Sequence, residues 1–307
     1  MAYHNCEKLK LIAVTGPTGA GKSTFINNVC GSNLEVGRGL RSCTKDIDVA
    51  YRMMGDTKVV LIDTPGFDDT TKSQADVLED IGQFLKKTYE DGVKVSGVIY
   101  MHRISDRRVG GIARENFRLF TKICGPDALR NVFIVTTMWN EVAEAVGRAR
   151  EEELVTKPIF YQSAVKRGAR MVRCHNNADS ARSIALALIE HAARRLQMQY
   201  ELVDERKQVP ETEAGSDLSE LLKEQETRHQ REMQALRDEM AEAHRTETPQ
   251  LRQELKRIND ELQRIQRELK KLQGESSIRR FLRVGFRVAG GYRVLLCWKV
   301  YGMLKSE

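Results

Sequence analysis

Gly16-Pro17-Thr18-Gly19-Ala20-Gly21-Lys22-Ser23 is the most informative segment of this 307-residue chain. It matches the pattern G-x-x-x-x-G-K-[ST] and lies between a short apolar run at 9–15 and a helical segment that begins near Lys22. Glycines in such a loop let backbone N–H groups turn inward around phosphate oxygens, and the helix N-terminus adds a partial positive charge. The sequence therefore predicts a P-loop in which Lys22 reaches the phosphates of a nucleotide and Ser23 ligates Mg²⁺. Thr24 is predicted to lie in the helix near the phosphates.

A second motif, Asp63-Thr64-Pro65-Gly66, follows the apolar run 59–62. Asp63 is therefore expected at the carboxyl end of a strand, where Mg²⁺ lies in nucleotide-binding folds of this type. Gly66 is expected to present its backbone N–H group to a γ-phosphate. The tetrapeptide alone is also compatible with an ordinary turn, but its position downstream of a P-loop favours the metal site.

Thr44 lies in the connection 33–45, between the first helix and the second predicted strand. This is where GTPases place a switch threonine, so Thr44 is predicted to complete the Mg²⁺ shell with Ser23 and Asp63. The alternative is a surface threonine in a loop.

Strand and helix signals alternate along the first part of the chain. Gly55-Asp56 separates two apolar segments, 46–53 and 58–62, which predicts an antiparallel hairpin. Further strands are predicted at 93–101, 132–137 and 171–174, and helices at 73–89, 112–124 and 180–195. This alternation predicts an α/β fold, a P-loop NTPase G domain with a mainly parallel sheet and helices on both faces.

After residue 196 the composition becomes rich in Glu, Gln, Lys, Arg and Leu, and apolar residues recur in alternating steps of four and three. These residues are Leu251, Leu255, Ile258, Leu262, Ile265, Leu269 and Leu272. Such a heptad seam predicts a long α-helical coiled coil that supports self-association, with a break near Pro249. The alternative is an amphipathic helix that packs back on the globular domain.

Three parts are thus expected: a G domain at 1–196, a coiled coil at 197–275, and a basic amphipathic tail at 276–307. The formal net charge is +7, and the basic residues are densest near the end of the chain. This charge is compatible with an anionic partner, and its concentration in the tail favours a membrane surface over nucleic acid. A helical tail would place Arg280, Arg283 and Arg287 on one side, with a hinge at Gly290-Gly291. Docking of the tail onto the G domain or a protein partner is the open alternative.

Six cysteines are scattered without C-x-x-C spacing, so neither a zinc site nor a disulfide framework is indicated. The polar start, residues 1–10, has no apolar segment of the secretory type. We therefore expect a cytoplasmic protein, peripheral on a membrane where the tail engages lipid.

The motifs 16–23, 42–44 and 63–66 resemble the AIG1/Toc34/septin group of GTPases. The strings Met101-His102-Arg103-Ile104-Ser105-Asp106 and Val135-Thr136-Thr137-Met138-Trp139 look like fungal AIG1-like G-domain proteins. The resemblance covers roughly residues 9–195. It implies a molecular switch that binds GTP or GDP with Mg²⁺ and is often coupled to dimerisation, through the G domain or the coiled coil, and to membranes.

Recognition of the base departs from the usual pattern. The N/T-K-x-D signature aligns with Thr137-Met138-Trp139-Asn140, so both the lysine and the aspartate are missing. An Asn140 amide offers guanine one acceptor and sets a donor against a donor, at a cost on the order of 1–3 kcal/mol. Trp139 is expected either to stack on the base or to lie in the core. Asn176 is the other candidate for contact with the base. It lies in the loop 175–177, which resembles the base-contacting loop of AIG1-type domains.

Catalysis also departs from the Ras pattern, because Phe67 follows Gly66 where a water-orienting glutamine is expected. Lys22, Thr44 and Gly66 are the predicted catalytic residues. Slow hydrolysis is therefore expected, with a missing group supplied across a dimer. The arginines Arg103, Arg107 and Arg108 are candidates for that role or form a solvated basic loop. The alternative function is a non-hydrolysing nucleotide-binding scaffold that acts through its coiled coil and tail; an ATPase or small-molecule kinase would not explain Asp63 and Thr44.

Overall fold

A mostly parallel β-sheet forms the centre of the molecule in the computed structural model, which describes residues 8–32, 48–64, 66–67, 72–242, 249–273, 287–288 and 292–293. The strands run in the order β6-β5-β4-β1-β3-β2-β7-β8. Their bounds are β1 Lys8–Thr15, β2 Asp48–Met54, β3 Thr57–Asp63, β4 Val95–Arg103, β5 Val132–Thr137, β6 Arg170–Arg173, β7 Arg287–Val288 and β8 Tyr292–Arg293. β2 and β3 pair antiparallel on either side of Gly55-Asp56, which confirms the predicted hairpin.

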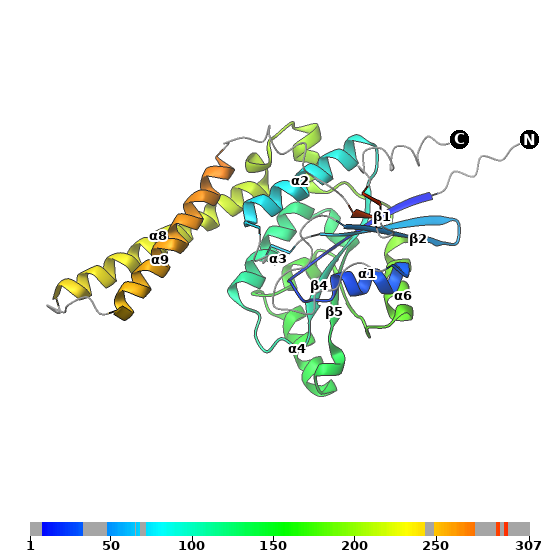
Figure 1. Cartoon of the computed structure of the whole chain (residues 1–307). Coiled ribbons are helices and arrows are strands. Elements are labelled where there is room, and N and C mark those ends of the chain that lie inside the picture. The colour runs from blue at the N-terminus through cyan, green and yellow to red at the C-terminus, as the bar shows by residue number, and fades with distance from the viewer. Residues whose placement is uncertain are drawn as a thin grey trace, which may run out of the picture.

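Helices cover both faces of this sheet (Figure 1). Their bounds are α1 Lys22–Cys30, α2 Gln74–Glu90, α3 Gly111–Cys124, α4 Glu144–Thr156, α5 Gln162–Lys166, α6 Ala178–Ile189, α7 Gln197–Gln199, α8 Glu213–Glu242 and α9 Pro249–Leu272. Shorter helical turns are η1 Ala128–Asn131, η2 Trp139–Glu141, η3 Tyr200–Asp204 and η4 Val209–Glu211. The α/β G-domain architecture predicted from the sequence is thus confirmed.

Two apolar cores lie on opposite faces of the sheet. On one face, α1 and α6 bury Phe25, Ile26 and Leu188 against β1 and β3. On the other, α2 and α3 bury Leu78 and Phe117 in a larger cluster. The inner strands are apolar on both sides because both faces are covered, and β5 is buried at every position.

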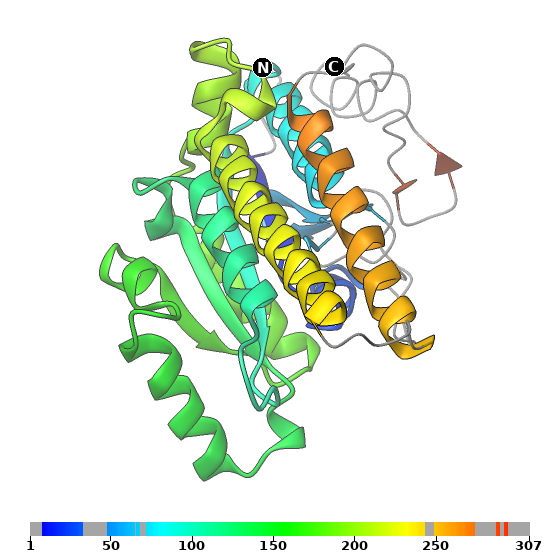
Figure 2. The same cartoon turned by 90° about the vertical axis from the view of Figure 1, so that its left-hand side faces the viewer.

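α8 and α9 lie side by side as a helical hairpin, and the end of the hairpin near residues 213 and 272 packs on α2 and α3 (Figure 2). Five residues of the heptad seam are buried within this one chain: Ile258, Leu262, Ile265, Leu269 and Leu272. The last three belong to the same apolar cluster as α2 and α3. Within this one chain, part of the predicted seam thus packs on α8 and on the globular domain, as the alternative describes. Self-association through a coiled coil stays a prediction.

Charged contacts join the hairpin to the G domain. The Lys271 ammonium lies 2.6 Å from the Asp76 carboxylate and donates to Ser73 Oγ, the cap of α2. Arg118 of α3 donates to Asp217 of α8 at 2.6 Å. The hairpin is thus attached to both α2 and α3 of the G domain.

The break that the sequence predicted near Pro249 agrees with the structure, because Pro249 begins α9. The sequence did not predict α4, because this Glu- and Arg-rich helix buries only two residues, Gly147 and Leu154.

In the tail, Arg287–Val288 forms a strand that pairs with β2, so the prediction of a helix is wrong at these two residues. The hinge at Gly290-Gly291 and most of the tail lie outside the described residues. Within the described part of the chain, the structure contains no helix with the length and apolar character needed to cross a membrane.

Candidate nucleotide site

The P-loop connects β1 to α1 at the carboxyl edge of the sheet. Gly21 ends the loop as the N-cap of α1, in a left-handed conformation with φ of 90°. Ala20 N–H donates to the Pro17 carbonyl at 3.1 Å, which closes the turn. The predicted strand–loop–helix context is therefore present, with the α1 N-terminus at the end of the loop.

Gly16 is required by close packing as well as by its backbone. Its φ is +136°, and a Cβ atom at this position would lie 2.5 Å from the Met101 carbonyl oxygen of β4. No side chain fits at that distance, so the first glycine of the motif lets the loop lie directly on the neighbouring strand.

Lys22 is buried, with its side chain folded over the loop. Its ammonium donates to the carbonyl oxygens of Gly16 at 2.9 Å and Pro17 at 3.1 Å. The positive charge is thereby held at the concave side of the loop, where phosphate oxygens are bound in P-loops.

Ser23 and Asp63 meet at the start of α1. Ser23 Oγ donates to Asp63 Oδ2 at 2.6 Å, although forty residues separate them in the sequence. Asp63 ends β3 and is 1% exposed. A hydroxyl and a carboxylate at this spacing form the hard oxygen pair that Mg²⁺ prefers, so the residues present fit the predicted metal. Thr44, the third predicted ligand, lies outside the described residues.

Two threonines connect the nucleotide-binding motifs by hydrogen bonds. A role was predicted from the sequence for Thr137 but not for Thr64. Thr64 donates through its hydroxyl and backbone N–H to the Val14 carbonyl at 3.0 and 3.2 Å, which fixes the second motif beside β1. Thr137 donates to the Ala20 carbonyl at 3.0 Å and so links the end of β5 to the P-loop. Thr137 had been predicted to bind nucleotide; here its hydroxyl supports the loop.

The remaining residues of the P-loop set lie where the motif requires. Pro17, Thr18 and Thr24 are half-buried, and Gly19 is exposed at the tip of the loop. Gly66 is buried, and Phe67 after it enters the core under α2 at 6% exposure. The Phe67 ring is therefore a core side chain.

The predicted base-recognition loops lie at the same edge of the sheet. Asn140 is exposed in η2, just after β5, and Asn176 is exposed after β6 with φ of 56°. Cys174 N–H donates to the Thr136 carbonyl at 2.9 Å, which holds the two loops side by side. The structure thus places both asparagines near one another in the fold, at the ends of adjacent strands.

Trp139 is held by the protein itself. Its Nε1 donates to Thr136 Oγ1 at 3.1 Å, and the Arg173 guanidinium lies 4.2 Å from the ring centroid. The edge of the ring also packs on Gly147 of α4. Stacking of this ring on a base would require these contacts to change.

Arg103 approaches the P-loop from β4 of the same chain. A Cβ atom at Gly19 would lie 3.2 Å from Arg103 Nη1, and Asp106 pairs with Arg103 at 3.1 Å. The sequence left open whether this arginine acts across a dimer or lies in a solvated basic loop, and the structure places it beside the P-loop of its own chain. Arg107 and Arg108 are in the adjoining loop.

Comparisons with known proteins agree with this geometry. Residues 11–122 match the model of the 50S ribosome-binding GTPase family. GTP-binding protein A of Dictyostelium discoideum is 30% identical over 131 residues, which cover 43% of this chain and 28% of that protein. Translocase of chloroplast 90 of Arabidopsis thaliana is 30% identical over 132 residues, which cover 41% of this chain and 16% of that protein. The matches thus span less than a third of the length of either relative.

Among solved structures, Toc33 from Arabidopsis thaliana in complex with Mg²⁺ and GMPPNP aligns over 62% of this chain and 87% of that chain. The sequence identity is 18% and the TM-score is 0.47. The N-terminal part of this chain thus has the fold of a P-loop GTPase G domain, and residues 11–122 are similar to the 50S ribosome-binding GTPase family.

Proposed function

We propose that this chain is a GTP-binding switch with slow, Mg²⁺-dependent GTP hydrolysis that is coupled to self-association. The observation that carries the proposal is the 2.6 Å contact between Ser23 and Asp63. It brings the end of the P-loop and the start of the second motif to one point, beside the buried Lys22. A nucleotide bound at the P-loop would therefore also contact the second motif, which begins at Asp63.

The chain's own residues have distinct roles in this proposal. The N–H groups of residues 18, 19 and 21 and the Lys22 ammonium bind the phosphates. Ser23, Asp63 and Thr44 are the protein groups that hold Mg²⁺. When bound, Mg²⁺ neutralises charge that develops on the β- and γ-phosphate oxygens. Gly66 presents its N–H group to the terminal phosphate and so reports whether that phosphate is present.

Slow hydrolysis follows from Phe67. Its ring is buried at 6% exposure and carries no hydrogen-bonding group, so it neither orients nor activates water. Intrinsic rates of GTPases without a complete set of catalytic groups are low. A group supplied by a second copy of the chain would raise the rate, and this is the proposed link to self-association through the G domain.

Guanine preference is supported by the similarity to GTP-binding protein A and to the 50S ribosome-binding GTPase family, and it is weakened by Asn140. The amide at this position satisfies one of the two guanine donors, so we propose a preference for GTP over ATP that is smaller than in proteins with the aspartate. Asn176 is proposed as the second contact with the base. Membership of the finer AIG1/Toc34/septin group, cytoplasmic placement and attachment of residues 276–307 to a membrane are proposed on the sequence patterns alone.

The test starts with the purified full chain. Nucleotide released on denaturation is identified by chromatography, and affinities for GTP and ATP are compared with and without Mg²⁺. Turnover is then measured over a range of protein concentrations, with Lys22→Ala as the inactive variant and Lys94→Ala, an exposed lysine outside the site, as the control.

The expected result is bound guanine nucleotide, Mg²⁺-dependent affinity, and a specific rate that rises with protein concentration. Equal affinity for GTP and ATP would contradict guanine preference. Binding without turnover at any protein concentration would support the scaffold alternative, which also predicts that Lys22→Ala leaves oligomerisation unchanged.

A further inference from the structure

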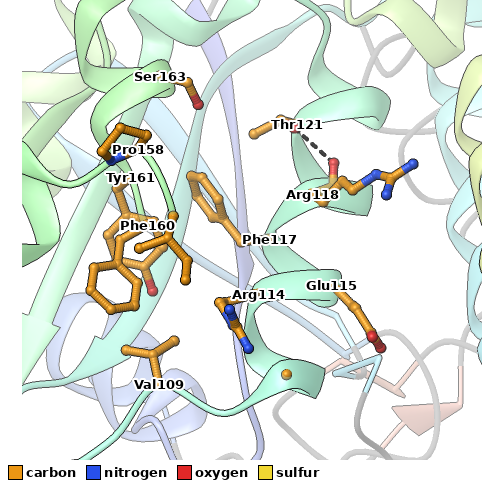
Figure 3. A pocket seen from close by; sticks show the side chains of 12 residues that line it. Val109, Arg114, Glu115, Phe117, Arg118, Thr121, Pro158, Phe160, Tyr161 and Ser163 are labelled. Carbon is orange, nitrogen blue, oxygen red and sulfur yellow. Dashed lines mark hydrogen bonds between the residues drawn. The ribbon is translucent and has the colours of Figure 1, made fainter.

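A cavity lies away from the P-loop, between α3 and the segment that joins α4 to α5 (Figure 3). Its volume is about 480 Å³, within the range of small-molecule sites. The floor is formed by the buried rings of Phe117 and Tyr161, and the sides include Val109, Ile159 and Phe160. The hydroxyl groups of Thr121 and Ser163 also line it. The cavity thus combines an aromatic floor with a few polar groups.

The charge that faces this cavity is positive. Among the described residues no ion pair is formed by Arg114, which lies beside Val109 in Figure 3. Arg118 turns away from the rings and is engaged by Asp217, and Glu115 also points away from them (Figure 3). The first turn of α3 contains no acidic residue, so its helix N-terminus adds to the positive potential of Arg114.

We propose that this cavity is a binding site for a small amphipathic carboxylate, whose apolar part lies on Phe117 and Tyr161 and whose carboxylate pairs with Arg114. The class follows from complementarity: aromatic and aliphatic walls favour an apolar body, and a guanidinium at the rim favours a carboxylate. A neutral molecule of the same shape would leave the arginine without a counter-ion and would bind more weakly.

A chain of contacts leads from this cavity to the P-loop. Tyr161 OH is hydrogen-bonded to His102 Nδ1 at 2.9 Å, and the His102 carbonyl accepts from Thr137, which also holds Ala20. Burial lowers the pKa of His102 to about 4, so the imidazole is neutral at pH 7. The residues on either side of it, Met101 and Arg103, are those that a Cβ atom at Gly16 or Gly19 would meet. Occupancy of the cavity is therefore expected to alter nucleotide release, a step that rests on the proposed function.

The binding part is tested with 4-phenylbutyrate as the probe and 4-phenylbutanamide as its neutral counterpart. Methyl NMR of the full chain follows Val109 and Ile159 in the cavity and Ile26 of α1 as a remote reference. We expect saturable shifts of the cavity methyl groups with a Kd on the order of 1 mM for the acid. The amide is expected to bind roughly tenfold more weakly, the value of one charge-assisted hydrogen bond.

Three variants separate the contributions. Arg114→Gln is expected to bring the acid down to the affinity of the amide, and Ser163→Phe is expected to fill the cavity and abolish both shifts. Arg167→Gln removes an exposed arginine outside the cavity and is expected to change neither. Equal binding of acid and amide to the wild type, or binding that survives Ser163→Phe in a folded protein, would overturn the site.

The coupling part is read separately, as the release rate of a fluorescent GDP analogue with and without 4-phenylbutyrate. A changed rate in the wild type that becomes insensitive to the probe in Tyr161→Phe, while the cavity methyl shifts persist, supports the contact chain. An unchanged wild-type rate at saturating probe overturns the coupling. If the chain binds no nucleotide, the proposed function fails, whereas the NMR arm still decides the carboxylate site.

Discussion

At the scale of single residues, Gly16 shows how the P-loop depends on a neighbouring strand. Substitution by Ala would place a methyl group 2.5 Å from the Met101 carbonyl oxygen, so the loop must move away from β4. We expect Gly16→Ala to lower both nucleotide affinity and the thermal midpoint, measured by calorimetry. Gly92→Ala is the matched control, because Gly92 has φ of +78° but open space around it. Its cost is expected to be only the backbone strain, about 1 kcal/mol. Equal effects of the two substitutions would show that strain, not contact with β4, governs the loop.

Asn140 decides how well guanine is distinguished from other bases. Asn140→Asp restores a carboxylate that accepts from both guanine donors, so the preference for GTP over ATP is expected to rise by roughly 10- to 100-fold. Competitive binding of the two nucleotides measures this ratio. Glu141→Gln, at the next residue, is the control and is expected to leave the ratio unchanged. No gain in Asn140→Asp would mean that the base lies elsewhere, with the loop of Asn176 as the next site to vary.

At the scale of elements, the contact between α9 and the start of α2 is expected to respond to pH. Burial raises the pKa of the Glu268 carboxyl above 4.5, while Arg264, the backbone N–H groups of Gln74 and Ala75, and Lys271 lower it in part. The folded state therefore holds this proton more tightly than the unfolded state. The resulting stability is present below the unfolded pKa and is lost as pH rises through the folded pKa.

Thermal midpoints measured from pH 4 upward test this expectation. In Glu268→Gln the side chain keeps its size and an acceptor but does not titrate, so the decrease in stability with rising pH just above 4.5 should be reduced. Glu152→Gln, an exposed glutamate of α4, is the comparison. If wild type and Glu268→Gln had identical profiles of thermal midpoint against pH, Glu268 would not be the source of the pH dependence.

At the scale of the whole molecule, the heptad seam distinguishes intramolecular from intermolecular packing. Ile265 is 7% exposed and lies in the cluster shared with α2 and α3. Ile265→Ala is therefore expected to cost about 2–5 kcal/mol of unfolding free energy, because a buried isoleucine is truncated. Denaturant unfolding at two protein concentrations measures this value, and the loss should be independent of concentration.

Sedimentation of the same variant provides the complementary measurement. If the seam joined two chains, Ile265→Ala would shift an oligomer toward monomer, and the stability loss would depend on protein concentration. Ile112→Ala, an exposed isoleucine of α3, serves as the control for general surface effects. If Ile265→Ala, but not Ile112→Ala, lost stability in a way that depended on protein concentration, packing of the seam within one chain would be contradicted.

The local features of this protein could be predicted from its sequence. The P-loop and the Gly55-Asp56 hairpin are written in residues whose backbone preferences and spacing are local, so their strands, turns and helix start were predictable. The heptad repeat likewise determined that α9 is an amphipathic helix. It did not determine what covers the apolar side, because the same spacing suits a second chain, α8, or the G domain.

Other contacts between residues distant in the sequence follow from the way the strands and helices pack. Arg103 reaches Gly19 because β4 lies beside β1, a contact that the sequence did not predict. The meeting of Ser23 and Asp63 was predicted from the motifs, but its geometry depends on β3 lying on the other side of β1. The cavity of Arg114 and Tyr161 exists because two helices and a loop, from separate parts of the sequence, leave space between them. Long-range contacts of this kind depend on strand order and helix packing, which no local pattern of residues encodes.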